Sequence, residues 1–183
     1  MLAGIVLATT IMYLRLLIVI AVFNRALAYA VAPPLLGLAA IGLLLAAALY
    51  WLSPQRHQTE IHAVAATNPL ELGAAAIFAV LFIVVSVASA WAVMKFGTAG
   101  IYVLAAIVGV SDIDPFVLSL AQNGAGQVSV SVGMIAILLA ASSNNLLKAT
   151  YAVAYSGGRR LIWPVAALAL LAAGGIGLAA VLA

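Results

Sequence analysis

The sequence GVSDIDPFVLSLAQ, residues 109–122, places two of the chain's four acidic residues at the end of a run that is otherwise apolar. Pro115 disfavours a helical conformation at the residue before it and removes a backbone donor. Asp114 followed by Pro115 is typical of a helix N-cap and the first residue of a new helix. We therefore expect the helix over residues 98–121 to break near its middle, leaving two half-helices that together make one membrane crossing.

The composition around this stretch is that of a membrane protein. Of the 183 residues, 68% are hydrophobic and 6% are charged, whereas soluble domains carry about 25% charged residues. Because a spanning helix takes roughly 20 apolar residues, 183 residues with short loops allow about six spans. The net charge of +3 indicates loop charges that orient the chain in a bilayer, and not a nucleic-acid surface. Cysteine is absent, which excludes disulfides, thiolate metal sites and cysteine nucleophiles.

The hydrophobic pattern predicts an all-α, polytopic transmembrane helical bundle that forms a single domain over residues 1–183. The expected spans cover residues 2–23, 29–52, 68–94, 98–121, 128–155 and 161–183. Residues 53–68 form the one clearly aqueous loop, and NPLE at residues 68–71 carries a capping box that opens the third span.

Orientation follows from lysine and arginine in the short loops. In the six-span arrangement, four basic residues fall on one side: Arg25, Lys95, Arg159 and Arg160. Arg56 falls on the other side, together with Glu60. This count predicts that the first side is cytoplasmic and that both termini lie outside.

Two carboxylates inside a span are costly, at about 2.5–3.5 kcal/mol each on insertion scales. Asp112 and Asp114 therefore need a cation, a basic side chain or a proton. Broken helices at membrane depth commonly form the ion or substrate site of transporters. In the alternative interpretation, the two aspartates only cap a helix at the outer water interface.

The predicted partners of these carboxylates lie in AASSNNLLKATYAVAY, residues 140–155. Asn144 lies four residues before Lys148 and Asn145 three before it, so both amides can share a helix face with the ammonium. We expect Ser143, Asn144, Asn145 and Lys148 to complete an ion-binding or pathway site. The alternative role of the serines and asparagines is helix–helix hydrogen bonding, which is worth about 0.6 kcal/mol per bond in membranes.

An internal repeat supplies one more basic group. AGIVLATTIMYLR, residues 3–15, aligns with AILLAASSNNLLK, residues 136–148, so that Thr9-Thr10 matches Ser142-Ser143 and Arg15 matches Lys148. In the six-span arrangement the two copies have the same orientation, which predicts a parallel repeat of spans one and two with spans five and six. We expect Arg15 to face the site; the alternative is that it snorkels toward the side of Arg25.

Together these motifs resemble the C-terminal membrane domain of MgtC/SapB-type bacterial membrane proteins, a domain of unknown function. The resemblance covers nearly the whole chain and depends most on G-x-S-D-x-D at residues 109–114 and N-x-x-x-K at residues 144–148. It implies a multi-pass protein of the bacterial inner membrane, without an upstream portion that is usual in the family. The family usually has alanine after the acidic motif, where this chain has Pro115. MgtC relatives are linked with magnesium limitation and partly act as regulators.

From these features we expect a transporter or channel component for a small cation. Asp112 and Asp114 would bind the metal ion or proton, and their oxygens suit Mg²⁺, Na⁺ or H⁺. Lys148 and Arg15 would hold the carboxylates when the ion is absent. The alternative is a regulatory or assembly subunit whose polar residues serve helix packing or partner binding.

Other partners and chemistries are expected as follows. The partners are the lipid bilayer and either a second copy of the chain or an MgtC-like membrane protein, with no nucleic acid. The sequence lacks G-x-S-x-G, H-E-x-x-H and P-loop motifs, so we expect no enzyme and no resident cofactor beyond a bound cation. His57, Glu60 and His62 are spaced to bind a surface metal, although loop residues of this kind are more often only solvated.

Overall fold

The computed structural model describes residues 2–52, 72–123, 128–155 and 162–183, and most of these residues are helical. They form α1 (Leu2–Phe23), α2 (Arg25–Leu52), α3 (Leu72–Val108), α4 (Ile113–Asn123), α5 (Val130–Tyr155) and α6 (Ile162–Leu182). The all-α prediction is confirmed. Five of these helices, all except α4, are long and apolar enough to cross a membrane. The predicted aqueous loop, with Arg56, His57, Glu60 and His62, lies outside the described residues, as does the predicted capping box.

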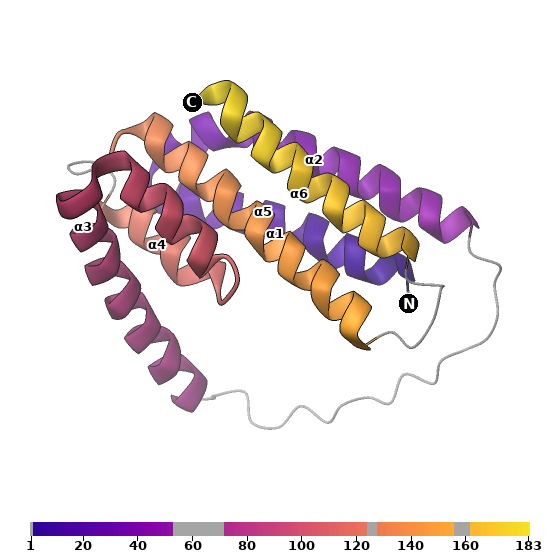
Figure 1. Cartoon of the computed structure of the whole chain (residues 1–183), viewed down its shortest axis with the longest axis horizontal. Helices are drawn as coiled ribbons and strands as arrows, with labels where there is room; N and C mark the ends of the chain where they lie inside the picture. Colours follow the sequence, from indigo (N-terminus) through magenta and orange to yellow (C-terminus); the bar gives the residue numbers. More distant parts are fainter. Residues whose placement is uncertain (1, 53–71, 124–127, 156–161) are drawn as a thin grey trace.

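Two antiparallel helix pairs, α1–α2 and α5–α6, make up most of the bundle (Figure 1). Asn24 separates α1 from α2, and its Oδ1 accepts a hydrogen bond from the Leu27 amide at 3.0 Å. This side-chain cap explains why α2 begins at Arg25 and not near residue 29 as predicted. Pro33 and Pro34 therefore lie inside α2 and not in its first turn.

A kink divides α3 into two parts. Gly97 has φ 59° and ψ −141°, a conformation that glycine adopts readily and other residues do not. The kink separates a long apolar helix over residues 72–96 from a half-helix over residues 98–108. The chain leaves the helical conformation after this half-helix, and α4 then returns beside it (Figure 1). We call residues 98–123 the re-entrant hairpin.

The predicted break is therefore confirmed, but its two halves do not add up to one crossing. Leu120, near the end of α4, lines one small pocket with Asn24 and Val128, which mark the ends of α1 and the segment before α5. The re-entrant hairpin thus enters and leaves at the same end of the bundle. Among the described residues this gives five helices that are long and apolar enough to cross a membrane and one hairpin, where the sequence predicted six spans.

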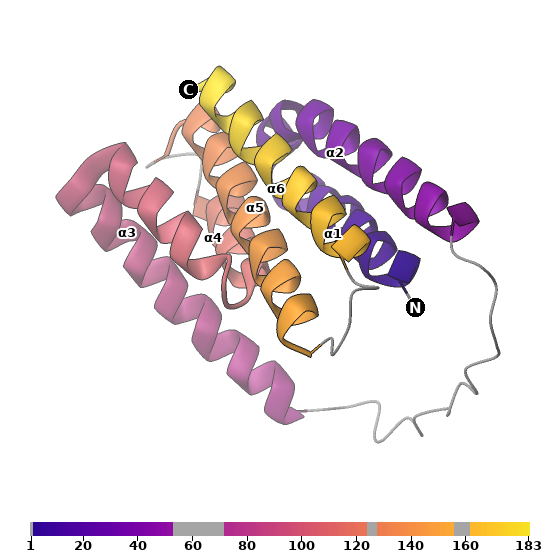
Figure 2. The ribbon, with the colours of Figure 1, turned by 45° about the vertical axis from the view of Figure 1, so that its right-hand side comes forward.

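Because the hairpin returns to the end of the bundle at which it entered, α5 runs in the direction opposite to the one predicted. Leu27 lies next to Gly133 at one end of the bundle, while Met12 contacts Lys148 further along, so α1 and α5 are antiparallel. The predicted parallel repeat is therefore wrong, because the two helix pairs are inverted relative to each other. The described chain also begins and ends at opposite ends of the bundle (Figure 2), which disagrees with the prediction that both termini share one side.

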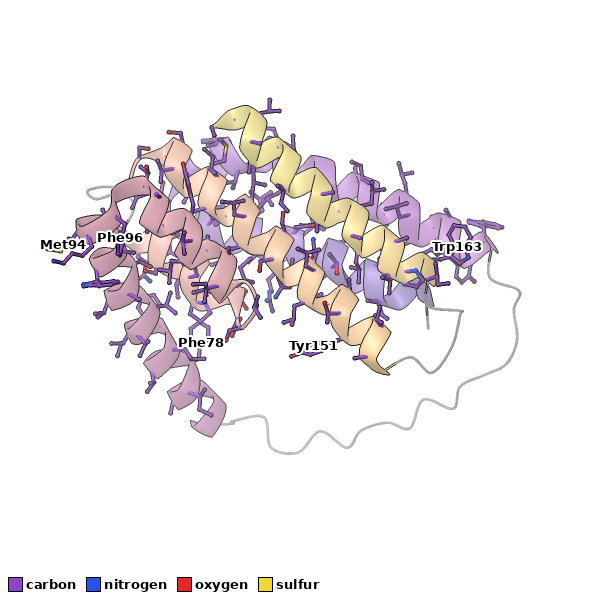
Figure 3. All side chains as sticks on the ribbon, in the orientation of Figure 1. Phe78, Met94, Phe96, Tyr151 and Trp163 are labelled. Atoms are coloured by element: carbon purple, nitrogen blue, oxygen red, sulfur yellow. The ribbon has the colours of Figure 1, made fainter. Side chains whose placement is uncertain are left out.

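Exposed aromatic side chains mark the two ends of the bundle. Tyr50 and Trp51 form an edge-on pair at the end of α2, and Trp163 lies at the start of α6, at the same end of the bundle (Figure 3). Trp91 and Phe96 form a second pair beside the Gly97 kink. Tryptophan and tyrosine gather at membrane–water interfaces. Along α2, Tyr29 and Tyr50 are separated by about 32 Å of helix, which matches a hydrocarbon thickness of about 30 Å.

Candidate functional site

The tip of the re-entrant hairpin carries both predicted aspartates. Its first half ends in a tight turn, in which the Ser111 amide donates to the Val108 carbonyl at 2.8 Å. Asp112 Oδ1 then accepts a hydrogen bond from the Asp114 amide at 3.1 Å. Asp112 is therefore the residue that caps α4, and not Asp114 as predicted, because α4 begins at Ile113. The side chain of Asp114 is left available for another partner.

Helix α5 holds this tip through the carbonyl groups that the end of a helix leaves without partners. Ser143 Oγ donates to the Ala106 carbonyl at 2.6 Å, and Asn144 Nδ2 donates to the Gly109 carbonyl at 3.1 Å. Gly109 lies so close to α5 that a Cβ there would overlap the Ala140 carbonyl. Ser143, which was predicted to line an ion pathway, thus positions the hairpin against α5.

An ion pair joins α1 to the hairpin tip. Arg15 Nη2 lies 2.8 Å from Asp114 Oδ1 and 2.6 Å from Asp114 Oδ2. The Asp114 side chain is 29% exposed and the Arg15 side chain 58%. Within the described part of the chain, this is the one ion pair. The sequence predicted that Arg15 would serve these carboxylates, and the structure brings the two groups together.

The ion pair lies well inside the apolar thickness of the bundle. Arg15 is about 12 Å along α1 from its end at Phe23, and Lys148 is about 10 Å along α5 from its end at Tyr155. Because α1 and α5 are antiparallel, these two helix ends lie on opposite sides of the bundle. Along these two helices, the ion pair therefore lies toward the middle of the bundle and not at one of its ends.

A pocket of about 320 Å³ adjoins the ion pair. Four polar side chains and four apolar ones line it: Arg15, Asp112, Asn144 and Lys148, with Ala8, Ile11, Met12 and Ile113. Lys148 Nζ donates to Met12 Sδ at 3.1 Å and makes no ion pair with a described carboxylate. The Oδ1 atom of Asn144 is buried and accepts no hydrogen bond from the described residues.

Asn145 takes a different position from the one predicted. Its Nδ2 donates to the hydroxyl of Tyr13 at 2.6 Å, and both side chains are fully buried between α1 and α5. It therefore connects the two helices and does not line the pocket.

Met12 and Tyr13 were not predicted to contribute to the site. The spacing of three residues between Met12 and Arg15, which puts both on one helix face, could have indicated Met12.

The chain matches one family of known proteins over most of its length. Residues 1–156 match the family model described as Domain of unknown function (DUF4010). The chain belongs to the DUF4010 family. An uncharacterised protein of Aquifex aeolicus (strain VF5) is 33% identical over 159 residues, which are 86% of this DUF4010 chain and 68% of the relative. No solved structure matches the chain.

These matches support the predicted domain of unknown function, but neither the family description nor the relative carries a link to MgtC or SapB. All residues of the site lie within the part of the DUF4010 chain that the family covers.

Two carboxylates are the acidic ligands that this DUF4010 site offers. Among the described residues, no group of three or more His, Cys, Asp or Glu side chains could hold a metal ion. Asp112 and Asp114 are therefore too few for a closed metal cage. They suit a proton or a cation that keeps part of its water shell, as Mg²⁺ usually does with one or two carboxylates.

Proposed function

We propose that this DUF4010 protein carries a small cation across the bacterial inner membrane, and that Asp112 and Asp114 bind the cation in transit. The observation that carries the proposal is the Arg15–Asp114 ion pair at the tip of the re-entrant hairpin. Charged side chains at membrane depth are expensive, and those that persist there mark ion pathways. Non-helical backbone at membrane depth is tolerated where protein satisfies it, and here Ser143 and Asn144 bond the Ala106 and Gly109 carbonyls at the hairpin tip.

The pairing supplies a simple exchange step. A cation that approaches Asp114 replaces the Arg15 guanidinium, which is 58% exposed and has room to withdraw. The carboxylates of Asp112 and Asp114 and the unpartnered Oδ1 of Asn144 provide oxygen ligands. When the cation leaves, Arg15 returns and neutralises the carboxylate. The Asp114 carboxylate is therefore never left without a cation in the hydrocarbon.

The charge balance favours a monovalent cation or a proton. Arg15 and Lys148 formally balance Asp112 and Asp114, so the four groups sum to no net charge. One entering Na⁺ or H⁺ needs only the displacement of one resident cation. Mg²⁺ would need both Arg15 and Lys148 to withdraw from the site.

Flux through purified protein in liposomes tests the proposal. We expect Na⁺ or H⁺ uptake by the wild-type chain, and its loss in Asp114→Asn and in Asp112→Asn, because both variants keep the side-chain shape and remove the charge. Ser89→Ala is the matched control, since Ser89 is buried in α3 and bonds only the Val85 carbonyl of its own helix. Absence of flux for Na⁺, H⁺ and Mg²⁺ in folded wild-type protein would contradict the proposal.

An assembly role is the second candidate, and the exposure of α3 favours it. The bundle covers 17% of the most apolar stretch of α3, against 33% to 56% for the other spanning helices. Such a helix suits contact with a second copy of the chain or with another membrane protein, an MgtC-like protein included. In this role the Ser143 and Asn145 hydrogen bonds serve packing alone. Substitution of Asp114 would then change stability or partner capture and produce no change in flux.

A further inference from the structure

The pocket beside the ion pair contains one carboxylate and one ammonium that are not paired with each other. Asp112 contributes the carboxylate from the hairpin tip, and Lys148 contributes the ammonium from α5. Asp112 accepts one backbone hydrogen bond, while Lys148 Nζ contacts the thioether of Met12, which is a weak acceptor. Asp112 can therefore accept further hydrogen bonds, and Lys148 can donate further ones, to a molecule in the pocket.

A buried amide oxygen adds a third unused group. Asn144 is 9% exposed, and its Nδ2 is held by the Gly109 carbonyl. Its Oδ1 accepts no hydrogen bond from the described residues, although the side chain lines the pocket. A buried polar atom without a partner costs about 1–3 kcal/mol. The oxygen is covered in this conformation, so a ligand that donates hydrogen bonds would gain this contact when the Asn144 side chain turns toward the pocket.

The pocket is large enough to hold a small organic solute in addition to a cation. Its volume of about 320 Å³ equals the space of about ten water molecules in the liquid. A bare metal ion fills only a small part of that space, whereas binding pockets for small organic molecules begin at about 300 Å³. The apolar side chains of Ala8, Ile11 and Ile113 line the remaining wall.

We propose that this pocket binds a small zwitterionic solute with the size and charge of a neutral amino acid. Its ammonium group contacts Asp112 and the Asn144 oxygen, its carboxylate contacts Lys148, and a short apolar side chain packs on Ile11 and Ile113. This inference rests on the proposed function and narrows it: while the solute occupies Asp112 and the Asn144 oxygen, Asp114 is the carboxylate that binds the cation in exchange for Arg15.

Binding to the full chain in lipid nanodiscs tests the inference. Radiolabelled L-alanine, L-serine and L-valine are the probes, and methylammonium and acetate are competitors that each carry half of the zwitterion. We expect saturable binding of at least one amino acid and little competition from either half. Asp112→Asn and Lys148→Met should each weaken binding by about 30-fold or more, since each removes one partner of a desolvated charge pair. Lys95→Met, which removes the other lysine at an exposed position near the Gly97 kink, should leave binding unchanged.

Cysteine protection gives a readout that does not depend on these charge variants folding. The chain has no cysteine, so Ala8→Cys introduces a single thiol at the pocket wall, and Ile18→Cys introduces one on a more exposed part of α1. Alanine should slow maleimide labelling at position 8 and have no effect at position 18. Equal labelling with and without all three amino acids, or binding that both halves compete for equally well, would overturn the inference. Cation flux that persists in that case would leave the proposed function standing.

Discussion

Removal of either partner of the Arg15–Asp114 ion pair should cost unequal amounts of stability. Arg15→Met leaves a carboxylate inside the apolar thickness without its cation, whereas Asp114→Asn leaves an arginine whose long side chain can move toward the membrane surface. Arg15→Met should therefore destabilise the protein more than Asp114→Asn. The double variant should recover part of the loss, because it leaves neither charge unpaired.

The exposure of the Arg15 and Asp114 side chains sets how much free energy of unfolding each variant should lose. Loss of one partner of a fully buried pair costs about 3–5 kcal/mol, and exposed pairs are worth about 0–1 kcal/mol. With Asp114 29% exposed and Arg15 58% exposed, we expect an intermediate loss, about 2 kcal/mol for Arg15→Met and about 1 kcal/mol for Asp114→Asn. The coupling energy of the double-mutant cycle should then be about 1–2 kcal/mol.

Unfolding in mixed micelles with increasing SDS, followed by far-ultraviolet circular dichroism, gives the free energies for the four corners of the cycle. Arg25→Met is the matched control, since it removes an exposed arginine at the start of α2 and should change stability by less than about 0.5 kcal/mol. The reasoning is refuted if the coupling energy is below about 0.3 kcal/mol, or if Asp114→Asn costs more than Arg15→Met.

Three further results are expected. Gly109→Ala should destabilise the protein by about 1–3 kcal/mol in the same unfolding assay, because the new Cβ overlaps α5; Gly37→Ala, with open space around it, should not. Ser143→Ala should cost about 1 kcal/mol more than Thr150→Ala, because the Ser143 hydroxyl bonds the hairpin and the Thr150 hydroxyl bonds only its own helix. Single cysteines at the two ends of the chain should react with a membrane-impermeant maleimide from opposite sides of sealed vesicles, because five of the described helices are long and apolar enough to cross a membrane. Reaction from the same side would contradict the re-entrant hairpin.

Local chemistry made the break at the hairpin tip predictable from the sequence, but it did not fix the direction of the chain beyond the break. Pro115 and the two aspartates act on neighbouring residues, so their effect can be read without knowing the fold. Whether the second half-helix continues or returns depends on contacts between distant residues. Ser143 and Asn144 on α5 take up the carbonyls of Ala106 and Gly109, and that capture is visible only in three dimensions.

For the candidate site, too, the sequence predicted the local requirements but not the contacts between distant residues. The need to neutralise a carboxylate in hydrocarbon predicted that a basic residue would meet the aspartates, and Arg15 does so. The sequence could not assign Asp112 and Asp114 their separate roles, because capping depends on where α4 begins. Nor could helical spacing show that Asn144 turns to the hairpin and Asn145 to Tyr13, since adjacent residues differ by about 100° around a helix and the packing partners decide which contact forms.

Because α5 runs opposite to the predicted direction, the internal repeat is inverted and not parallel, which bears on the proposed transport mechanism. The Thr10 hydroxyl lies where a Cβ of Gly42 would be, and the Ser142 hydroxyl lies in the same way against Gly175, so each helix pair contains the same hydroxyl-on-glycine contact. The two contacts agree with the sequence repeat to within one residue, but the two pairs run in opposite directions. Inverted repeats in transporters bind their substrate at the interface between the repeats. Here Arg15 and Lys148 are the corresponding basic residues, and the hairpin tip contacts both repeats, through Arg15 of α1 and through α5.

In the arrangement observed, Arg15 forms an ion pair with Asp114, and Lys148 donates a hydrogen bond to the sulfur of Met12. If the two repeats exchanged their arrangements, Lys148 would take the place of Arg15 at the carboxylate, and the pocket would face the other side of the membrane. A carboxylate between two equivalent cations is neutralised in both states. For the transport that we propose, this means that a cation could bind and leave on either side while the charge of Asp114 stays compensated.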